Sequence, residues 1–182
     1  MEKILENNII KLRAPEPEDL DIMYRWENDT SLWEYGSSLT PYSRFALKKY
    51  LIDSKQDLYS DKQLRMMVVL KKTNLPIGTV DLYDFDPYHR RAGVGILIDT
   101  EFRQEGYGLQ ALDLLDKYAF DFLNFHQLYA FIPESNIGSL ELFKKADYIR
   151  SGLLNDWLSQ GSIFTNVVIM QKINTMGYAA RY

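Results

Sequence analysis

The chain has 182 residues, of which 46% are hydrophobic and 25% charged, and its formal net charge is −4. This composition predicts one soluble globular domain, and the net acidity disfavours a nucleic-acid-binding protein. The absence of cysteine excludes disulfides and thiolate catalysis, and two histidines are too few for a multi-histidine metal site. No apolar run approaches the roughly 20 residues of a membrane-spanning helix, and the N-terminus lacks a signal-peptide pattern. We therefore expect a cytoplasmic protein that uses no metal and binds neither nucleic acid nor membranes.

The first half of the sequence predicts a strand, two helices and a β-hairpin. Pro17, Glu18 and Asp19 suit the start of the first helix, because proline lacks a donor and the acids complement the helix dipole. The turn TNLP joins the two strands of the hairpin. In chain order these elements cover residues 8–16, 15–29, 43–53, 64–72 and 77–86.

The second half begins with a strand, residues 91–99, that is apolar on both faces near its end, as in a buried central strand. Leucines then recur at spacings of three and four, which predicts an amphipathic helix. A strand, a short helix and a closing hairpin about Gly161 follow, over residues 127–133, 136–146 and 148–173. This order predicts a mixed α/β sheet. We expect one domain over residues 1–174 and a C-terminal tail over 175–182, which lacks a core pattern.

Three known phosphate-binding loops compete for the turn RQEGYGLQA at residues 103–111. A nucleoside triphosphate loop is excluded, because it requires Gly-Lys-Ser/Thr where this chain has Gly108, Leu109 and Gln110. The segment GYGLQA matches the dinucleotide fingerprint G-x-G-x-x-G/A, with Glu134 placed to bind a ribose. In that fold the glycines follow the strand almost directly, whereas TEFRQE intervenes here, so the dinucleotide alternative is weaker.

The string RQEGYG also fits Q/R-x-x-G-x-G/A, the pyrophosphate loop of acetyl-CoA-dependent N-acetyltransferases. The first amides of a helix have no partner inside it and carry the positive end of the dipole, so they bind anions. Gly106 and Gly108 are expected to let the backbone approach the diphosphate without an intervening Cβ, and Arg103 to add a positive charge.

With this loop in its context, the chain resembles the GNAT superfamily, and within it the bacterial spermidine and ribosomal-protein N-acetyltransferases. The likeness runs from about Arg13 to Ile173 and includes LRAPEPEDLDIMYRWENDTSLW, PIGTVDLYDFDPYHRRAGVGILI and LNFHQLYAFIPESNIGSLELFKKADY. It implies a mixed, mostly antiparallel sheet whose central parallel strand pair is splayed around the cofactor, with helices on both faces. It also implies acetyl-CoA as co-substrate and a possible homo-oligomer.

The resemblance assigns the cofactor to one strand, one loop and one helix. The strand backbone would pair with the pantetheine arm, the loop amides would hold the pyrophosphate, and the helix would supply Asn136, whose simpler role is a helix N-cap. The implied residues are Ile96, Leu97, Ile98, Arg103, Gln104, Glu105, Gly106, Tyr107, Gly108, Leu109, Asn136, Ser139 and Phe143.

Catalysis by direct attack of a neutral amine on the thioester requires a base, and a proton donor for the leaving thiolate. Many relatives place a tyrosine where this chain has Phe143, so Ser139, one turn after Asn136, is the acid candidate. Many relatives also carry a glutamate where this chain has Gly93. The base therefore stays open among Glu34 and the strand acids Asp81, Asp84 and Asp86.

The expected acceptor is a primary amine, either a polyamine such as spermidine or a protein N-terminus. Acids and aromatic residues in the segment ENDTSLWEYG, including Trp33 and Tyr35, can bind a cation. Phe143 and Gly93 together leave open a coenzyme-A-binding module without catalysis, and the dinucleotide-binding protein is the remaining alternative.

Overall fold

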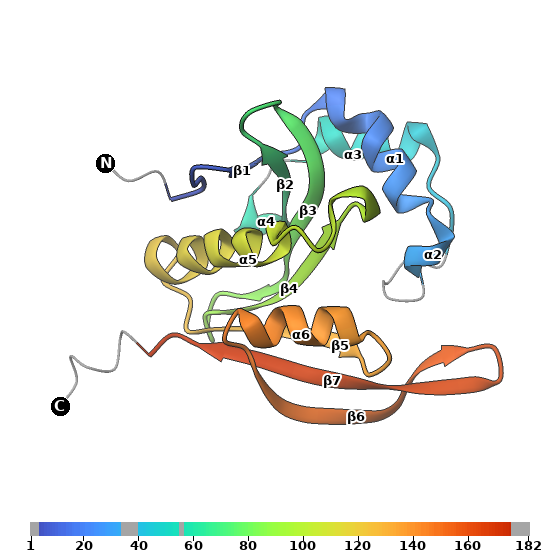
Figure 1. Ribbon diagram of the computed structural model, residues 1–182, viewed down its shortest axis with the longest axis vertical. Coiled ribbons are helices and arrows are strands. Elements are labelled where there is room, and N and C mark those ends of the chain that lie inside the picture. The colour runs from blue at the N-terminus through green and yellow to red at the C-terminus, as the bar shows by residue number, and fades with distance from the viewer. Residues whose placement is uncertain (1–3, 34–39, 55–56, 176–182) are drawn as a thin grey trace.

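The computed structural model describes residues 4–33, 40–54 and 57–175, and these build one seven-stranded sheet in the order β1-β2-β3-β4-β5-β7-β6 (Figure 1). The strands are β1 (Ile10–Arg13), β2 (Leu64–Leu70), β3 (Leu75–Asp86), β4 (Arg91–Ile98), β5 (Gln127–Pro133), β6 (Ile149–Gln160) and β7 (Ile163–Ile173). The helices are α1 (Leu20–Glu27), α2 (Thr30–Trp33), α3 (Arg44–Asp53), α4 (Leu58–Asp61), α5 (Tyr107–Lys117) and α6 (Ile137–Lys145). Short 3-10 turns occupy Pro17–Asp19 and Thr100–Phe102, and a π-helical turn, Tyr118–Phe122, extends α5.

The strand pairing confirms the predicted mixed sheet. Neighbouring strands are antiparallel except for β4 and β5, which run parallel. That parallel pairing covers only Arg91–Gly93 against Gln127–Tyr129. Beyond it the two strands diverge, while β4 stays paired with β3 as far as Ile98. We call the opening between Val94–Ile98 and Ala130–Pro133 the fork, and its apex lies at Gly93.

Helices cover both faces of the sheet, as expected. Side chains of β4 that point to one face, such as Val94, pack in the main core with Leu112 and Leu115 of α5. On the opposite face Met67 and Val69 of β2 form a second buried cluster with residues of α1 and α3. Figure 1 shows α1 and α3 together at one end of the molecule, away from the long β6–β7 hairpin. The sheet therefore separates a face covered by α5 and α6 from a face covered by α1 and α3.

The predicted tail lies outside the described residues apart from Thr175, so the domain boundary at residue 174 stays a prediction. Across the described ranges, every helix is too short or too polar to cross a lipid bilayer.

Candidate active site

Two helix N-termini stand at the two tips of the fork. β4 ends at Ile98 and leads through the turn 99–106 into α5, and β5 ends at Pro133 and leads through Asn136 into α6. The two helices also touch, because Leu142 of α6 packs over the first turn of α5 at Gly108. One end of the fork therefore combines an open strand edge with the starts of two helices.

The turn before α5 has the backbone of an anion-binding site. Gln104 has φ 65° and Gly106 has φ 78°, so left-handed residues turn successive amides toward one side. The first helical hydrogen bond of α5 runs from Gln110 N to Gly106 O, at 3.3 Å. The amides of Tyr107, Gly108 and Leu109 therefore precede the helical ladder, and they fit the diphosphate predicted there.

The two glycines of this turn serve different purposes. A Cβ on Gly106 would meet no atom within 4 Å, but its φ of 78° lies in the left-handed region that favours glycine. A Cβ on Gly108 would come within 3.2 Å of Leu142 and 3.7 Å of Ile98. The close approach of α6 is thus a packing reason for Gly108, and its expected role beside the diphosphate stays a prediction.

The end of β4 is tied to its surroundings by polar contacts. Arg103 Nε donates to the Ile98 carbonyl at 2.9 Å, which fixes the turn against the strand. Asp99 accepts from Trp26 Nε1 at 2.8 Å and from Arg25 at 2.5 Å, which links β4 to α1. Burial opposes ionisation of Asp99, but these donors outweigh it and lower the pKa of the carboxyl. Arg103 thus has a structural role beside the predicted anion site, and part of its guanidinium stays available.

Asn136 is the N-cap of α6, since its Oδ1 accepts from the Ser139 amide at 3.1 Å. The cap uses only the side-chain oxygen, and the side-chain NH₂ group has two donors of its own. Capping is therefore compatible with a hydrogen bond from Asn136 to pantetheine. Ser139 is partly buried on the first turn of α6. Phe143 is only 2% exposed and packs edge-on against Tyr148, with ring centroids 5.0 Å apart, so it is a core residue here.

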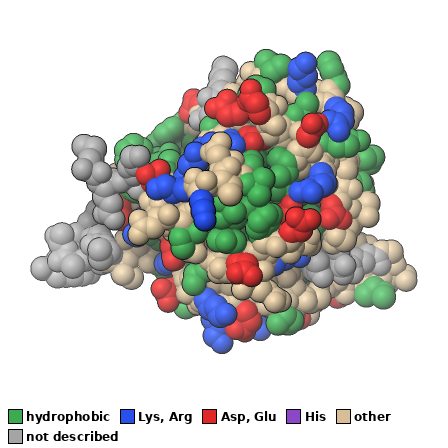
Figure 2. All heavy atoms as spheres, turned by 45° about the horizontal axis from the view of Figure 1, so that its top comes forward, with side chains coloured by type: hydrophobic (Ala, Val, Ile, Leu, Met, Phe, Trp, Pro, Cys, Tyr) green, Lys and Arg blue, Asp and Glu red, His purple; other side chains and the backbone are tan. Residues whose placement is uncertain are grey.

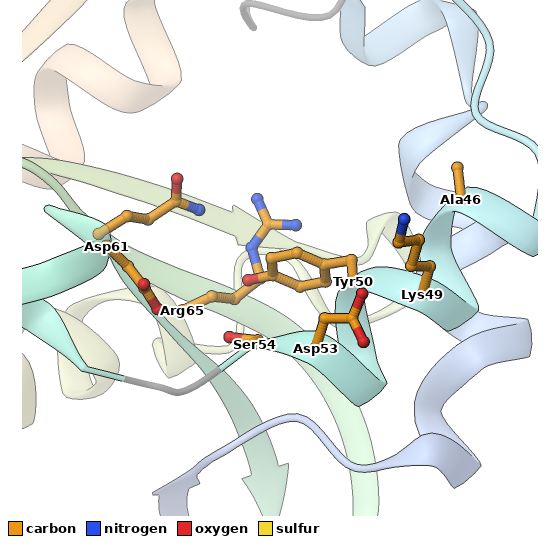
Figure 3. A pocket seen from close by; sticks show the side chains of 8 residues that line it. Ala46, Lys49, Tyr50, Asp53, Ser54, Asp61 and Arg65 are labelled. Carbon is orange, nitrogen blue, oxygen red and sulfur yellow. The ribbon is translucent and has the colours of Figure 1, made fainter.

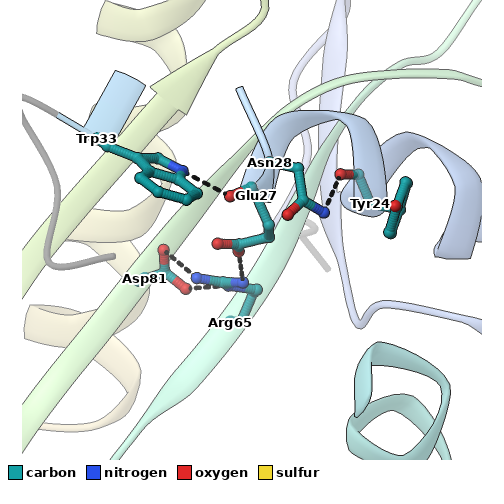
Figure 4. A network of polar contacts seen from close by, with 6 residues as sticks. All are labelled: Tyr24, Glu27, Asn28, Trp33, Arg65 and Asp81. Carbon is teal, nitrogen blue, oxygen red and sulfur yellow. Dashed lines mark hydrogen bonds and ion pairs between the residues drawn. The ribbon is translucent and has the colours of Figure 1, made fainter. Parts of the chain in front are cut away.

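On the face of α1 and α3, an ion-pair network joins three elements (Figure 4). Arg65 of β2 donates to Asp81 of β3 at 2.7 Å and to Glu27 of α1 at 2.5 Å. Burial raises the pKa of Asp81, although Arg65 opposes that shift, and the two carboxylates hold the pKa of Arg65 above its usual value. Asp81 is therefore a carboxylate that takes up a proton more readily than a solvated one, as a general base requires.

A cavity of about 470 Å³ adjoins this network and shares Arg65 with it (Figure 3). It lies between α3 and the segment that leads into β2, with Tyr50 and Arg65 at its centre. Acidic and basic side chains both line it, namely Lys49, Asp53, Asp61 and Arg65. The cavity thus places charged side chains next to a candidate base.

Two aromatic rings, those of Tyr83 and Tyr129, lie at the apex of the fork. Tyr83 of β3 pairs directly with Gly93, and a Cβ on Gly93 would lie 2.3 Å from the Tyr83 ring. The ring of Tyr129 in β5 meets the Tyr83 ring edge-on, with centroids 6.2 Å apart. Tyr83 therefore occupies the space that a side chain at position 93 would fill.

The candidate acids from the sequence are distributed unevenly. Asp81 lies in the network, whereas Asp84 is exposed at the β3 bulge and Asp86 binds the His89 amide and Arg91 near the strand end. Glu34 lies outside the described residues. Glu134, the ribose candidate of the dinucleotide alternative, accepts from Asn166 at 3.0 Å.

Sequence reasoning missed Arg65 and Tyr83, because no local motif marks a residue whose partners are distant in the chain.

Comparison with known proteins gives the family. The profile described as "Acetyltransferase (GNAT) domain" matches residues 10–149. The chain is similar to the spermidine N(1)-acetyltransferase of Escherichia coli K12, 26% identical over 162 residues, which covers 88% of this chain and 84% of the relative. It is also similar to the uncharacterized N-acetyltransferase p20 of Bacillus licheniformis, 26% identical over 149 residues, 81% of this chain and 83% of the relative.

Solved structures share the fold. A spermidine N-acetyltransferase from Vibrio cholerae, in complex with CoA and spermine, gives a TM-score of 0.82 at 22% identity, over 92% of this chain and 96% of that one. The ribosomal-protein-S5-alanine acetyltransferase from Vibrio fischeri gives 0.81 at 19% identity, over 94% and 96%. The family profile covers most of this sequence, and this match excludes the dinucleotide-binding alternative. The chain belongs to the GNAT acetyltransferase family and is an acetyl-CoA-dependent N-acetyltransferase.

Proposed function

We propose that this enzyme acetylates a primary amine of a small cationic molecule, with a polyamine such as spermidine as the first candidate. The observation that carries the proposal is the fork, with an anion-binding helix start at its tip and a carboxylate network on the opposite face. An acetyl donor on one face and an amine on the other meet only through such an opening. The named relatives supply the polyamine as the candidate acceptor.

Acetyl-CoA supplies the activated acetyl group, and the residues at the tip of the fork fit it. The open edge of Ile96–Ile98 provides backbone donors and acceptors for the pantetheine amides, as an added strand would. The amides from Gln104 to Leu109, assisted by Arg103, hold the diphosphate, and the Asn136 side chain donates to the pantetheine. Ser139, on the first turn of α6, supplies the proton to the departing sulfur.

Asp81 takes the proton of the attacking amine. A protonated amine cannot attack, and an amine of pKa about 10 is almost fully protonated at neutral pH, so a base beside it is required. The pKa of Asp81 is raised by burial, which favours its protonated product state. Arg65 orients the carboxylate through two donors, at 2.7 and 3.5 Å.

The charges around the acceptor face favour a cation of modest charge. The network and the adjoining cavity together hold Glu27, Asp53, Asp61 and Asp81 against the cations Lys49 and Arg65. Figure 2, which shows one face of the molecule, has acidic and basic side chains interspersed around a hydrophobic patch. Recognition of a polyamine therefore depends on these local carboxylates.

We also propose that the chain self-associates through the β6–β7 hairpin. Three large apolar side chains of this hairpin, Trp157, Ile163 and Phe164, are 60%, 67% and 58% exposed. One of the similar structures is a dodecameric spermidine N-acetyltransferase from Vibrio cholerae.

The acceptor is tested by measuring CoA release from acetyl-CoA with spermidine, putrescine, an aminoglycoside and a peptide with a free N-terminus. We expect spermidine to give the highest kcat/KM. If the peptide is acetylated and none of the polyamines is, the acceptor is a protein N-terminus and the polyamine proposal is wrong.

A further inference from the structure

Tyr83 spans the apex of the fork. Its ring lies over Gly93, where an added Cβ would be 2.3 Å from both Cε2 and Cζ. Gly93 is the last residue of β4 that pairs with β5, opposite Tyr129. On the β5 side the Tyr83 ring meets the ring of Tyr129 edge-on, with centroids 6.2 Å apart. The ring of a β3 residue, with its hydroxyl-bearing Cζ over Gly93, therefore lies where β4 and β5 separate.

The donor state of this hydroxyl is well defined. Burial, and the nearby Tyr129, raise the pKa of Tyr83 to about 12, although the Phe131 backbone opposes the shift. The phenol thus keeps its proton throughout the neutral range. A protonated phenol is a hydrogen-bond donor, so the Tyr83 O–H can donate to an acceptor placed beside it.

This step rests on the proposed function, in which the thioester end of acetyl-CoA points toward the apex of the fork. The diphosphate site begins directly after Ile98, and the open edge of β4 runs from Ile98 back to Gly93 over about 16 Å of extended strand. An extended pantetheine arm that follows this edge places its thioester toward the apex. Asp81, two residues before Tyr83, faces the same side of the sheet.

We propose that the Tyr83 hydroxyl is a catalytic group that donates a hydrogen bond to the thioester carbonyl oxygen of acetyl-CoA. As the amine nitrogen bonds to the acetyl carbon, an electron pair moves onto that oxygen, and Tyr83 stabilises the developing charge without giving up its proton. The pair then returns, the carbon–sulfur bond breaks and its pair stays on sulfur. Asp81 has taken one proton from the ammonium group before attack, and the second nitrogen proton restores the hydroxyl of Ser139, which gives its own proton to sulfur.

The first test compares Tyr83→Phe with Tyr129→Phe. Tyr83→Phe keeps the ring over Gly93 and removes only the oxygen, so the fold is retained. We expect kcat to fall about 10²-fold, the effect of losing one oxyanion donor. Tyr129→Phe, the matched loss of a neighbouring hydroxyl, should change kcat less than threefold. Equal losses in both variants, or normal kcat in Tyr83→Phe, would overturn the assignment.

Two further readouts do not depend on the acceptor. The slow hydrolysis of acetyl-CoA in the absence of any amine should fall in Tyr83→Phe as acetyl transfer does. In calorimetry, Tyr83→Phe should bind acetyl-CoA about fivefold more weakly, the effect of one hydrogen bond, while its affinity for CoA is unchanged. If both readouts match the unmodified protein, Tyr83 does not touch the carbonyl. If they change as expected while spermidine is not acetylated, the acceptor proposal fails and the Tyr83 proposal stands.

Discussion

The two faces of the sheet prepare for their ligands by different means. On the face of α5 and α6 the proposed binding features are backbone groups, namely the open edge of β4 and the first amides of α5. On the face of α1 and α3 they are charged side chains, with Arg65 held between Glu27 and Asp81. Backbone features tolerate wide variation in side chains, whereas a side-chain network changes its chemistry with each substitution. Substitutions should therefore alter the proposed acceptor site more readily than the proposed cofactor site.

The largest expected effect on kcat comes from the face of α1 and α3, at Asp81. Asp81→Asn keeps the shape of the residue and an acceptor for Arg65 but removes the base. We expect kcat for amine acetylation to fall about 10³-fold, within the range for general bases, with acetyl-CoA affinity unchanged. Asp81 acts as a base only when it is unprotonated, and its pKa is raised above the ordinary carboxyl value of about 4. As the pH is lowered, the activity of the unmodified enzyme should therefore begin to fall at a higher pH than an ordinary carboxyl group would give.

The matched control for this variant is Asp84→Asn. Asp84 lies on the same strand but is exposed, and asparagine tolerates its φ of 49°. We expect kcat within threefold of the unmodified enzyme. A similar loss in both variants would mean that the acceptor face responds to net charge and that Asp81 is not the base.

An intermediate effect is expected at Ser139, where the two faces meet in the reaction. Ser139→Ala should lower kcat about 10²-fold if its hydroxyl protonates the sulfur. Acetyl-CoA affinity should change at most about fivefold, because one neutral hydrogen bond contributes only about 1 kcal/mol. The measurement is steady-state kinetics alongside calorimetry. Normal turnover in Ser139→Ala would leave water as the proton donor.

The smallest effect is expected on the face of α5 and α6, from a substitution in the turn before α5. Gly161 provides an internal control for this substitution. Gly106 and Gly161 both have positive φ, 78° and 67°, and a Cβ on either would meet open space. Alanine at either site costs about 1–2 kcal/mol of backbone strain, so both variants should lose similar thermal stability. Only Gly106→Ala should weaken acetyl-CoA binding, by about tenfold. Equal affinities in the two variants would separate the turn from the cofactor.

Much of the fold is predictable from the sequence because its signals are local. The hairpin of β2 and β3, the strand β5 and the start of α6 at Asn136 lie where apolar patterning and turn residues predict them. The short helices α2 and α4 escape prediction, since four residues carry too little periodicity. The π-helical turn after Lys117 escapes it too, because the apolar pattern there indicates a continuous α-helix.

The candidate site divides in the same way. The diphosphate turn is a contiguous motif, so its residues can be proposed from the sequence alone. The network joins residues 38 and 16 positions apart in sequence, and only the sheet register brings Arg65 opposite Asp81. Tyr83 over Gly93 depends likewise on the register of β3 with β4. A glycine on a central strand has many possible causes, and its sequence context does not identify the ring that fills the space.

Hydrogen exchange with and without acetyl-CoA tests the assignment of the cofactor to the fork most directly, since it reports on the backbone without any substitution. We predict that acetyl-CoA slows exchange in the segments 94–98 and 104–109, where strand-edge and helix-start amides gain a partner. The turn at Gly161 should exchange equally fast in both conditions. Saturating acetyl-CoA that leaves exchange at 94–98 and 104–109 unchanged would contradict the assignment.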